Sequence, residues 1–211
     1  IMYVGSIFMT AFMARRGGLA MSIMYLVLAW LMYSLNDRNT STIKMILMAL
    51  VVVGLCYVLF TNMADSFFAT LMERGVENSR VGVEESFYGD MKSTTDWAFG
   101  RGWFGRYYDP LFGNWRSAIE TGYLALVLRG GLLYLIPYIC CLFLTFFNGY
   151  FRSNNLFCKS FGLICLMQII SLYPYGWPAF NFFHFFVWLG VWICNNKSIR
   201  IQNDDNIKMI F

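Results

Sequence analysis

The sequence predicts an all-α fold, a polytopic transmembrane helical bundle with a large, partly helical extracytoplasmic loop. Of the 211 residues, 58% are hydrophobic, 19% are aromatic and only 13% are charged, whereas soluble domains average about 25% charged residues. The mean hydropathy is +0.53. Apolar runs of membrane-crossing length flank one long polar segment, 62–120, which carries nine of the twelve acidic residues. This composition excludes a water-soluble domain.

The apolar runs predict five membrane spans and part of a sixth, within a single membrane domain. A full span needs about 20 apolar residues, so the first run is too short. Because residue 1 is Ile and no signal-peptide pattern precedes this run, we expect an N-terminally truncated fragment. Pro137 is expected to kink the longest helix. The predicted spans are 1–13 (partial), 19–35, 45–61, 122–147, 160–173 and 179–194.

The basic residues predict the orientation of the spans, because Lys and Arg in short loops favour the cytoplasm. Placing 36–44, 148–159 and the polar tail 195–211 in the cytoplasm collects seven basic residues there. The loop 62–120 then faces the opposite side. The Arg15–Arg16 pair falls on that side as well, against the rule, which makes it a candidate for a functional role.

The loop 62–120 is predicted to be ordered and functional. Connections of about 60 residues are uncommon between helices, and its many Trp, Tyr, Phe and Gly residues argue against disorder. Residues 65–74 have the spacing of a short helix at the membrane surface. The string Gly100-x-Gly102-x-x-Gly105 matches a dinucleotide-binding pattern, but no strand precedes it. We therefore expect no nucleotide site there.

Arginines dominate the predicted outer face and suggest binding of a diphosphate. A guanidinium group donates two parallel hydrogen bonds to phosphate oxygens and stays charged at any relevant pH. The alternative is that the loop arginines form salt bridges with the loop carboxylates and contact ordinary anionic phospholipid. The candidate diphosphate-binding residues are Arg15, Arg16, Arg80, Arg101 and Arg116.

Glu120 has two interpretations. Ser117 and Glu120 have the spacing of a capping box at the start of the helix that follows. Alternatively, Glu120 is a carboxylate at the membrane face that acts as the general base on an acceptor hydroxyl. The spacing alone leaves both open.

The sequence contains no pattern typical of a metal site or of a catalytic nucleophile. The single histidine, His184, lies in an aromatic run without ligands at metal-binding spacing, so a hydrogen-bonded packing role is expected. All six cysteines lie in or beside apolar runs, which suits small buried side chains. We expect no metal and no cofactor.

The order of several short motifs resembles the C-terminal part of the bacterial O-antigen polymerase and O-antigen ligase family of polytopic glycosyltransferases. The likeness covers nearly the whole chain, although each motif is short, and Ala14-Arg15 departs from the family pattern just before Arg16. The matching motifs are Arg16-Gly17, Asn78-Ser79-Arg80, Gly100-Arg101-Gly102, Tyr107-Tyr108, Glu120-x-Gly122-Tyr123-Leu124 and Arg129-Gly130-Gly131.

The resemblance implies transfer of an oligosaccharide from an undecaprenyl diphosphate carrier to a sugar hydroxyl, at the outer face of the bacterial inner membrane. Arg16, Arg80 and Arg101 would then grip the diphosphate, and Glu120 would be the base. Since ligases of this family have a histidine at the position of Glu120, the glutamate favours a polymerase. Implied partners are the carrier-linked oligosaccharide, membrane lipids and a chain-length regulator protein, with no nucleic acid.

Two other functions remain open. A ligase of the same family would move finished polysaccharide onto an acceptor. A transporter of anionic lipid-linked sugars would use the arginines as a binding path, but it predicts basic residues deep in several spans. Only Arg129 is expected to lie within a span, so the sequence favours the transporter least.

Overall fold

A computed structural model divides the chain into two units, Ile1–Asn78 and Ser79–Phe211. In the first unit, residues 24–30 are helical, within the predicted span 19–35. The predicted elements 1–13, 45–61 and 65–74 lie outside the described residues, as do Arg15 and Arg16. The described residues are 24–30, 32, 34, 79–110, 112–175, 178 and 182–210.

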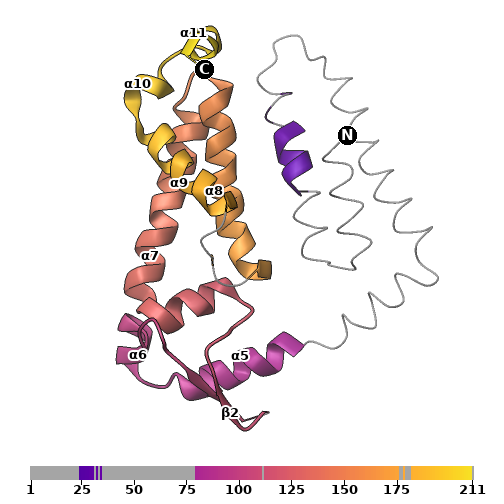
Figure 1. Ribbon diagram of the computed structural model, residues 1–211, viewed down its shortest axis with the longest axis vertical. Coiled ribbons are helices and arrows are strands. Elements are labelled where there is room, and N and C mark those ends of the chain that lie inside the picture. The colour runs from indigo at the N-terminus through magenta and orange to yellow at the C-terminus, as the bar shows by residue number, and fades with distance from the viewer. Residues whose placement is uncertain are drawn as a thin grey trace, which may run out of the picture. The chain divides into compact units, whose positions relative to one another are not determined.

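Three apolar helices form the main part of the second unit: α7 (Gly122–Phe151), α8 (Leu156–Tyr175) and α9 (Phe182–Asn195). Figure 1 shows the long part of α7 and α8 side by side. Within the described residues, α7 and the Leu156–Tyr173 part of α8 are long and apolar enough to cross a membrane, whereas the apolar part of α9 is shorter. The described chain is therefore mostly helical, with two candidate membrane-spanning helices.

The ends of these helices differ from the predicted spans 122–147 and 160–173. Helix α7 continues to Phe151, and α8 begins before residue 160, at Leu156. Asn155 explains the earlier start, because its Oδ1 accepts a hydrogen bond from the backbone N–H of Cys158 (2.8 Å). This is an N-terminal cap that a hydropathy pattern does not reveal.

Small residues bring α7, α8 and α9 into close contact. A Cβ atom added at Gly149 would lie 2.6 Å from Cys194 Sγ and 2.8 Å from the carbonyl oxygen of Cys158. Such small residues are common where membrane helices approach closely. Near the other end of the bundle, Tyr123 donates its hydroxyl to the carbonyl oxygen of Ile169 (2.6 Å). The buried residues between the helices include Leu126, Tyr138, Leu142, Cys165, Leu172 and Val187.

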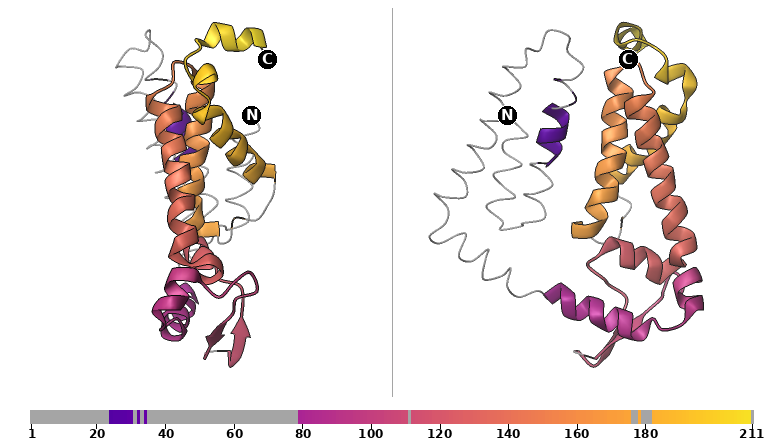
Figure 2. Two further views of the ribbon diagram at one scale, coloured as in Figure 1. Left: turned by 90° about the vertical axis from the view of Figure 1, so that its left-hand side faces the viewer. Right: turned by 180° about the vertical axis from the view of Figure 1, so that it is seen from behind.

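Helix α7 is broken at Gly131, whose φ of 66° and ψ of −171° lie outside the helical region. Residues 122–130 lie across the end of the bundle, and the remainder of α7 rises from it (Figures 1 and 2). The prediction of one continuous helix was therefore wrong at Gly131, while the kink at Pro137 stays a prediction. The break follows from a contact, since the backbone of Gly131 lies against the carbonyl group of Ala98.

The second half of the predicted loop folds into a small structure that we call the cap. It comprises α5 (Ser79–Asp90), α6 (Thr94–Phe99) and an antiparallel hairpin of β1 (Tyr107–Asp109) and β2 (Asn114–Arg116). The hairpin, at the lower end in Figure 2, was not predicted. The cap packs on the first part of α7 through an apolar core. Its buried residues are Phe87, Met91, Tyr107, Ile119, Leu124, Ala125, Val127 and Leu128.

The predicted polar tail 195–211 also folds within its described part. It forms α10 (Lys197–Arg200) and α11 (Asp204–Ile210) at the end of the bundle away from the cap (Figure 1). Asn155, 1% exposed, donates to the carbonyl oxygens of Ile199 (3.0 Å) and Gln202 (2.9 Å). One buried amide therefore ties the tail to the start of α8.

Candidate functional site

The predicted site residues fall into three groups. Arg15 and Arg16 lie outside the described residues. Arg80 lies in the first turn of α5, and only its backbone is described. Arg101, Arg116 and Glu120 are described in full and belong to the cap or its junction with α7.

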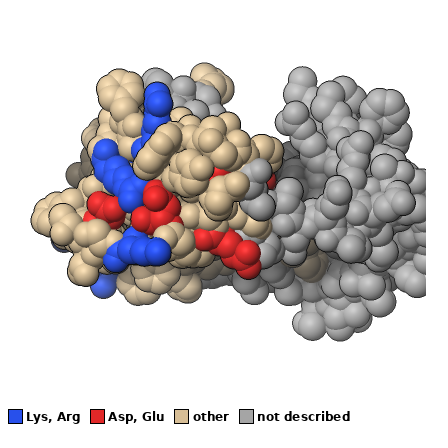
Figure 3. All heavy atoms as spheres, turned by 90° about the horizontal axis from the view of Figure 1, so that it is seen from below, with Lys and Arg blue, Asp and Glu red and all other residues tan. Residues whose placement is uncertain are grey.

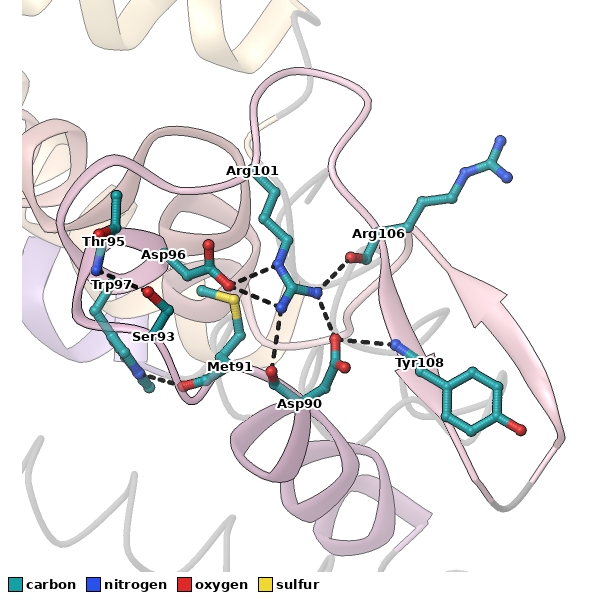
Figure 4. Close-up of polar contacts among 9 residues, drawn as sticks. All are labelled: Asp90, Met91, Ser93, Thr95, Asp96, Trp97, Arg101, Arg106 and Tyr108. Atoms are coloured by element: carbon teal, nitrogen blue, oxygen red, sulfur yellow. Dashed lines mark hydrogen bonds and ion pairs between the residues drawn. The ribbon is translucent and has the colours of Figure 1, made fainter.

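Arg101 is enclosed by two carboxylates of the cap (Figure 4). Its Nε and Nη2 donate to Asp96 Oδ2 at 3.0 and 2.8 Å, and its Nη1 forms an ion pair with Asp90 Oδ2. The remaining donors reach the carbonyl oxygens of Arg106 (2.9 Å) and Asp90 (3.1 Å). Every nitrogen of the guanidinium group thus holds a part of the cap in place.

The electrostatics of Arg101 follow from these contacts. Burial disfavours its charge, but hydrogen bonds and charges from Asp96 and Asp90 outweigh burial and raise the pKa of the guanidinium above its ordinary value. Asp90 Oδ2 also accepts the backbone N–H of Tyr108 (3.2 Å). Arg101 therefore connects α5, α6 and β1, as the salt-bridge interpretation of the loop arginines predicts. A diphosphate would have to compete with two carboxylates for it.

Arg116 forms a second ion pair, with Asp109. Its Nη1 lies 2.9 Å from Asp109 Oδ2, and the Asp109 side chain is fully buried. Ser86 donates its hydroxyl to Asp109 Oδ1 (3.2 Å), which links the pair to α5. The hydrogen bond that Arg116 donates to Asp109 raises the pKa of Arg116, against a smaller opposing effect of burial. Arg116 also lies over the ring of Phe112, 4.9 Å from its centre.

Glu120 is exposed and stands just before α7. The predicted capping box was wrong, because α7 begins at Gly122 and Thr121, not Ser117, is its N-cap residue. Thr121 makes no side-chain cap and instead donates its hydroxyl to Glu84 Oε1 (2.5 Å) on α5. This hydrogen bond holds the start of α7 against α5 of the cap.

The charge of Glu120 has a minor electrostatic effect on two groups of the cap. The charge of Glu120 contributes to the raised pKa of Arg116 and, after burial and the effects of Arg116 and Asp109, to the raised pKa of Tyr107. A carboxylate and a guanidinium therefore lie near each other where the polar cap meets the apolar helix. Arg101 belongs to the separate group around Asp90 and Asp96.

The glycine-rich string contacts the Arg129-Gly130-Gly131 segment directly. The N–H of Arg101 donates to the carbonyl oxygen of Leu128 (2.7 Å). A Cβ added at Gly100 would lie 2.7 Å from the backbone nitrogens of Gly130 and Gly131. The guanidinium of Arg129 lies 5.1 Å from the centre of the Trp103 ring. The two glycine motifs are therefore packing partners, and Arg129 belongs to the cap surface.

His184 lies in α9 and makes a hydrogen bond within that helix. Trp188 Nε1 donates to His184 Nε2 (2.9 Å), and His184 is 8% exposed, as its predicted packing role requires. Among the residues that the structure describes, no group of three or more His, Cys, Asp or Glu side chains could hold a metal ion.

The acidic partners Glu84, Asp90, Asp96 and Asp109 were not predicted individually. The high acidic content of the loop indicated that the loop arginines have carboxylate partners nearby. It did not indicate which carboxylate pairs with which arginine. Figure 3 shows the consequence on one face of the molecule, where basic and acidic side chains lie next to one another. Exposed aromatic side chains accompany them on the cap: Tyr88, Phe99, Trp103, Phe104, Tyr108, Phe112 and Trp115.

The chain was also compared with known proteins. No protein-family model matches it, and neither a search of curated proteins nor a search of solved structures finds a match.

Proposed function

We propose that this chain is a membrane polysaccharide polymerase that transfers an oligosaccharide from an undecaprenyl diphosphate carrier to a sugar hydroxyl. The reaction takes place at the extracytoplasmic face of the bacterial inner membrane. One observation carries the proposal: Glu120 is an exposed carboxylate at the junction where the cap enters the apolar helix α7. The family resemblance of the sequence motifs supports the same activity.

In the proposed reaction, Glu120 takes the proton of the acceptor hydroxyl as its oxygen bonds to the anomeric carbon of the donor sugar. The bond between that carbon and the diphosphate oxygen breaks, and the electron pair leaves with undecaprenyl diphosphate. A single displacement inverts the anomeric configuration. Because diphosphate is a good leaving group, the protein mainly has to position it and offset its charge, as arginines can do.

The contacts in the cap divide the arginines by role. Arg101 and Arg116 are held by Asp90, Asp96 and Asp109, which suits positioning residues of the cap. The proposal therefore assigns the diphosphate chiefly to Arg16, Arg15 and Arg80.

The test is chain extension in cells that carry Glu120→Gln, which keeps the size of the side chain but removes its basicity. We expect single repeat units to accumulate, with Arg16→Ala showing the same defect. Asp205→Asn is the matched control, because Asp205 is an exposed carboxylate on α11, at the other end of the bundle. Membrane fractions must contain equal amounts of each variant. Normal polymer length in Glu120→Gln would refute the assigned base.

A ligase is the second candidate, and the same gels separate it from a polymerase. Loss of a ligase leaves long chains on the carrier, whereas loss of a polymerase leaves single repeat units. The transporter gains no support in the described residues, because Arg129 contacts Trp103 of the cap beside the break of α7.

A further inference from the structure

A pocket of about 430 Å³ lies within the cap, between α5 and the hairpin. Tyr108 and Pro110 form one wall, and α5 forms the other. Ligand pockets commonly enclose about 300–1,000 Å³ and combine apolar walls with a few placed polar groups. The volume is thus sufficient for a small organic ligand.

The α5 wall is a single face of the helix. Gly82, Glu85, Ser86 and Gly89 line the pocket at successive positions i, i+3, i+4 and i+7, the spacing of residues that share one side of a helix. The two glycines place no side chain in this wall, and Glu85 and Ser86 between them are its polar residues.

Gly89 has no evident role in the fold. A Cβ atom added there would meet nothing within 4 Å, and its φ is not in the left-handed region. Glycine destabilises a helix relative to alanine, and neither a close contact nor an unusual backbone angle requires it here. Its absent side chain leaves this part of the pocket wall open to a ligand.

The polar groups of the pocket suit a ligand that donates hydrogen bonds. Glu85 is exposed, and the structure gives it no hydrogen bond or ion pair within the described part of the chain. Asp90 adds a second carboxylate. Ionised carboxylates only accept hydrogen bonds, so they pair well with hydroxyl or amino groups. Asp90 is already paired with Arg101, so the charge of Glu85 is the one that would repel a diphosphate.

The aromatic residues suit the apolar face of a sugar ring. Tyr108 is 41% exposed, and Trp115, 59% exposed, meets it edge to face with ring centres 5.6 Å apart. Partly exposed aromatic rings supply contact area beside a polar surface. Carboxylates and an aromatic ring in one pocket together match a neutral or amino-bearing saccharide.

The pocket wall is linked by contacts to the part of the cap that precedes α7. Ser86, in the pocket wall, donates to Asp109, and Asp109 pairs with Arg116. On α5, Glu84 precedes the pocket residue Glu85 and accepts the hydroxyl of Thr121, the residue after Glu120.

We propose that this pocket binds the acceptor saccharide, one or two sugar units that are neutral or carry an amino group. The identification of this saccharide as the acceptor rests on the proposed function. Saccharide binding itself can be tested without catalysis.

The test is saturation-transfer NMR on the full chain in detergent, with N-acetylglucosamine, galactose, glucose and rhamnose as separate probes. We expect at least one sugar to receive saturation. Gly89→Trp, which fills the pocket, should reduce that signal at least fivefold. Gly89→Ala also removes the glycine from the helix but adds only one carbon atom, so it should keep the saturation-transfer signal within twofold of the parent chain.

A second pair of variants guards against misfolding of the tryptophan variant. Tyr108→Phe should retain binding, and Tyr108→Ala should lose it, with both eluting as the parent chain does in size exclusion. The inference is overturned if none of the four sugars receives saturation, if Gly89→Trp retains the signal, or if inorganic pyrophosphate displaces the sugar.

The two proposals fail separately. If Glu120→Gln extends chains normally while sugar binding responds to Gly89→Trp, the polymerase reaction is wrong and the saccharide pocket stands. If Glu120→Gln abolishes extension and no sugar binds, only the pocket is wrong.

Discussion

Gly131 and Ala98 lie backbone against backbone, where the cap meets the break in α7. A Cβ atom at Gly131 would collide with the carbonyl group of Ala98. Because Gly131 also has φ of 66°, two independent constraints require glycine at this position. The contact attaches the cap to the apolar helices and determines where the first part of α7, residues 122–130, ends.

Gly131→Ala should therefore destabilise the protein strongly. A left-handed non-glycine residue costs of the order of 1–3 kcal/mol, and the clash with Ala98 adds to that cost. Gly113→Ala is the matched control, because Gly113 has φ of 62° but nothing within 4 Å of an added Cβ. Thermal unfolding in detergent should show the larger loss for Gly131→Ala. Equal losses would mean that the contact with Ala98 does not matter.

Arg101→Lys should loosen the cap, because a lysine cannot reproduce the planar fork that bonds Asp90 and Asp96. Hydrogen bonds to charged groups contribute about 1.5–3 kcal/mol, so we expect a loss of about 2 kcal/mol in the free energy of unfolding. Arg106→Ala should change stability little, since Arg106 is exposed and only its carbonyl oxygen meets Arg101.

The same variant distinguishes positioning from diphosphate binding. If Arg101 acts through the cap, chain extension by Arg101→Lys should return at a lower growth temperature at which the variant is folded. A well-folded Arg101→Lys protein that extends no chains at any temperature would instead indicate direct contact with the substrate.

Asp109→Asn should be costly, because it leaves Arg116 without its carboxylate partner inside the cap. Breaking one partner of a buried ion pair costs about 3–5 kcal/mol, and we expect a value near the lower limit because the Arg116 side chain is 32% exposed. Asp205→Asn removes an exposed pair with Lys208 and should cost less than about 1 kcal/mol. Urea titration of both variants checks the difference, and similar midpoints would contradict it.

Gly149→Ala should weaken the contact between α7, α8 and α9, because its Cβ would meet Cys194 Sγ and the carbonyl oxygen of Cys158. Overpacking of this kind costs about 1–3 kcal/mol. At Gly162 the nearest atoms to an added Cβ lie 3.2 Å away or further, so Gly162→Ala should be better tolerated. Thermal unfolding in detergent, at the same detergent concentration for both variants, makes the comparison. An unchanged midpoint for Gly149→Ala would contradict the close approach.

Much of the candidate site could be predicted as a set of residue types but not as an arrangement. The sequence indicated that the loop arginines face either a diphosphate or loop carboxylates. The choice of partners depended on the fold, since Asp90 is 11 residues from Arg101 along the chain and Asp109 is 7 residues from Arg116. The capping box failed for a related reason: Thr121 bonds Glu84, 37 residues away, and no local pattern could reveal that bond.

The sequence by itself determined that the apolar segments are helical and that the cap is an ordered structure. Both properties follow from local apolar runs and from total aromatic content, which can be read without knowing the fold. Only the tertiary structure decided that α7 breaks at Gly131, that β1 and β2 pair, that Arg101 lies between two carboxylates and that Arg116 pairs with Asp109. The break depends on a contact between residues far apart in the chain, Ala98 and Gly131, whereas the hairpin and the ion pairs depend on which nearby residues the fold places side by side. Such contacts leave no periodic pattern in the sequence.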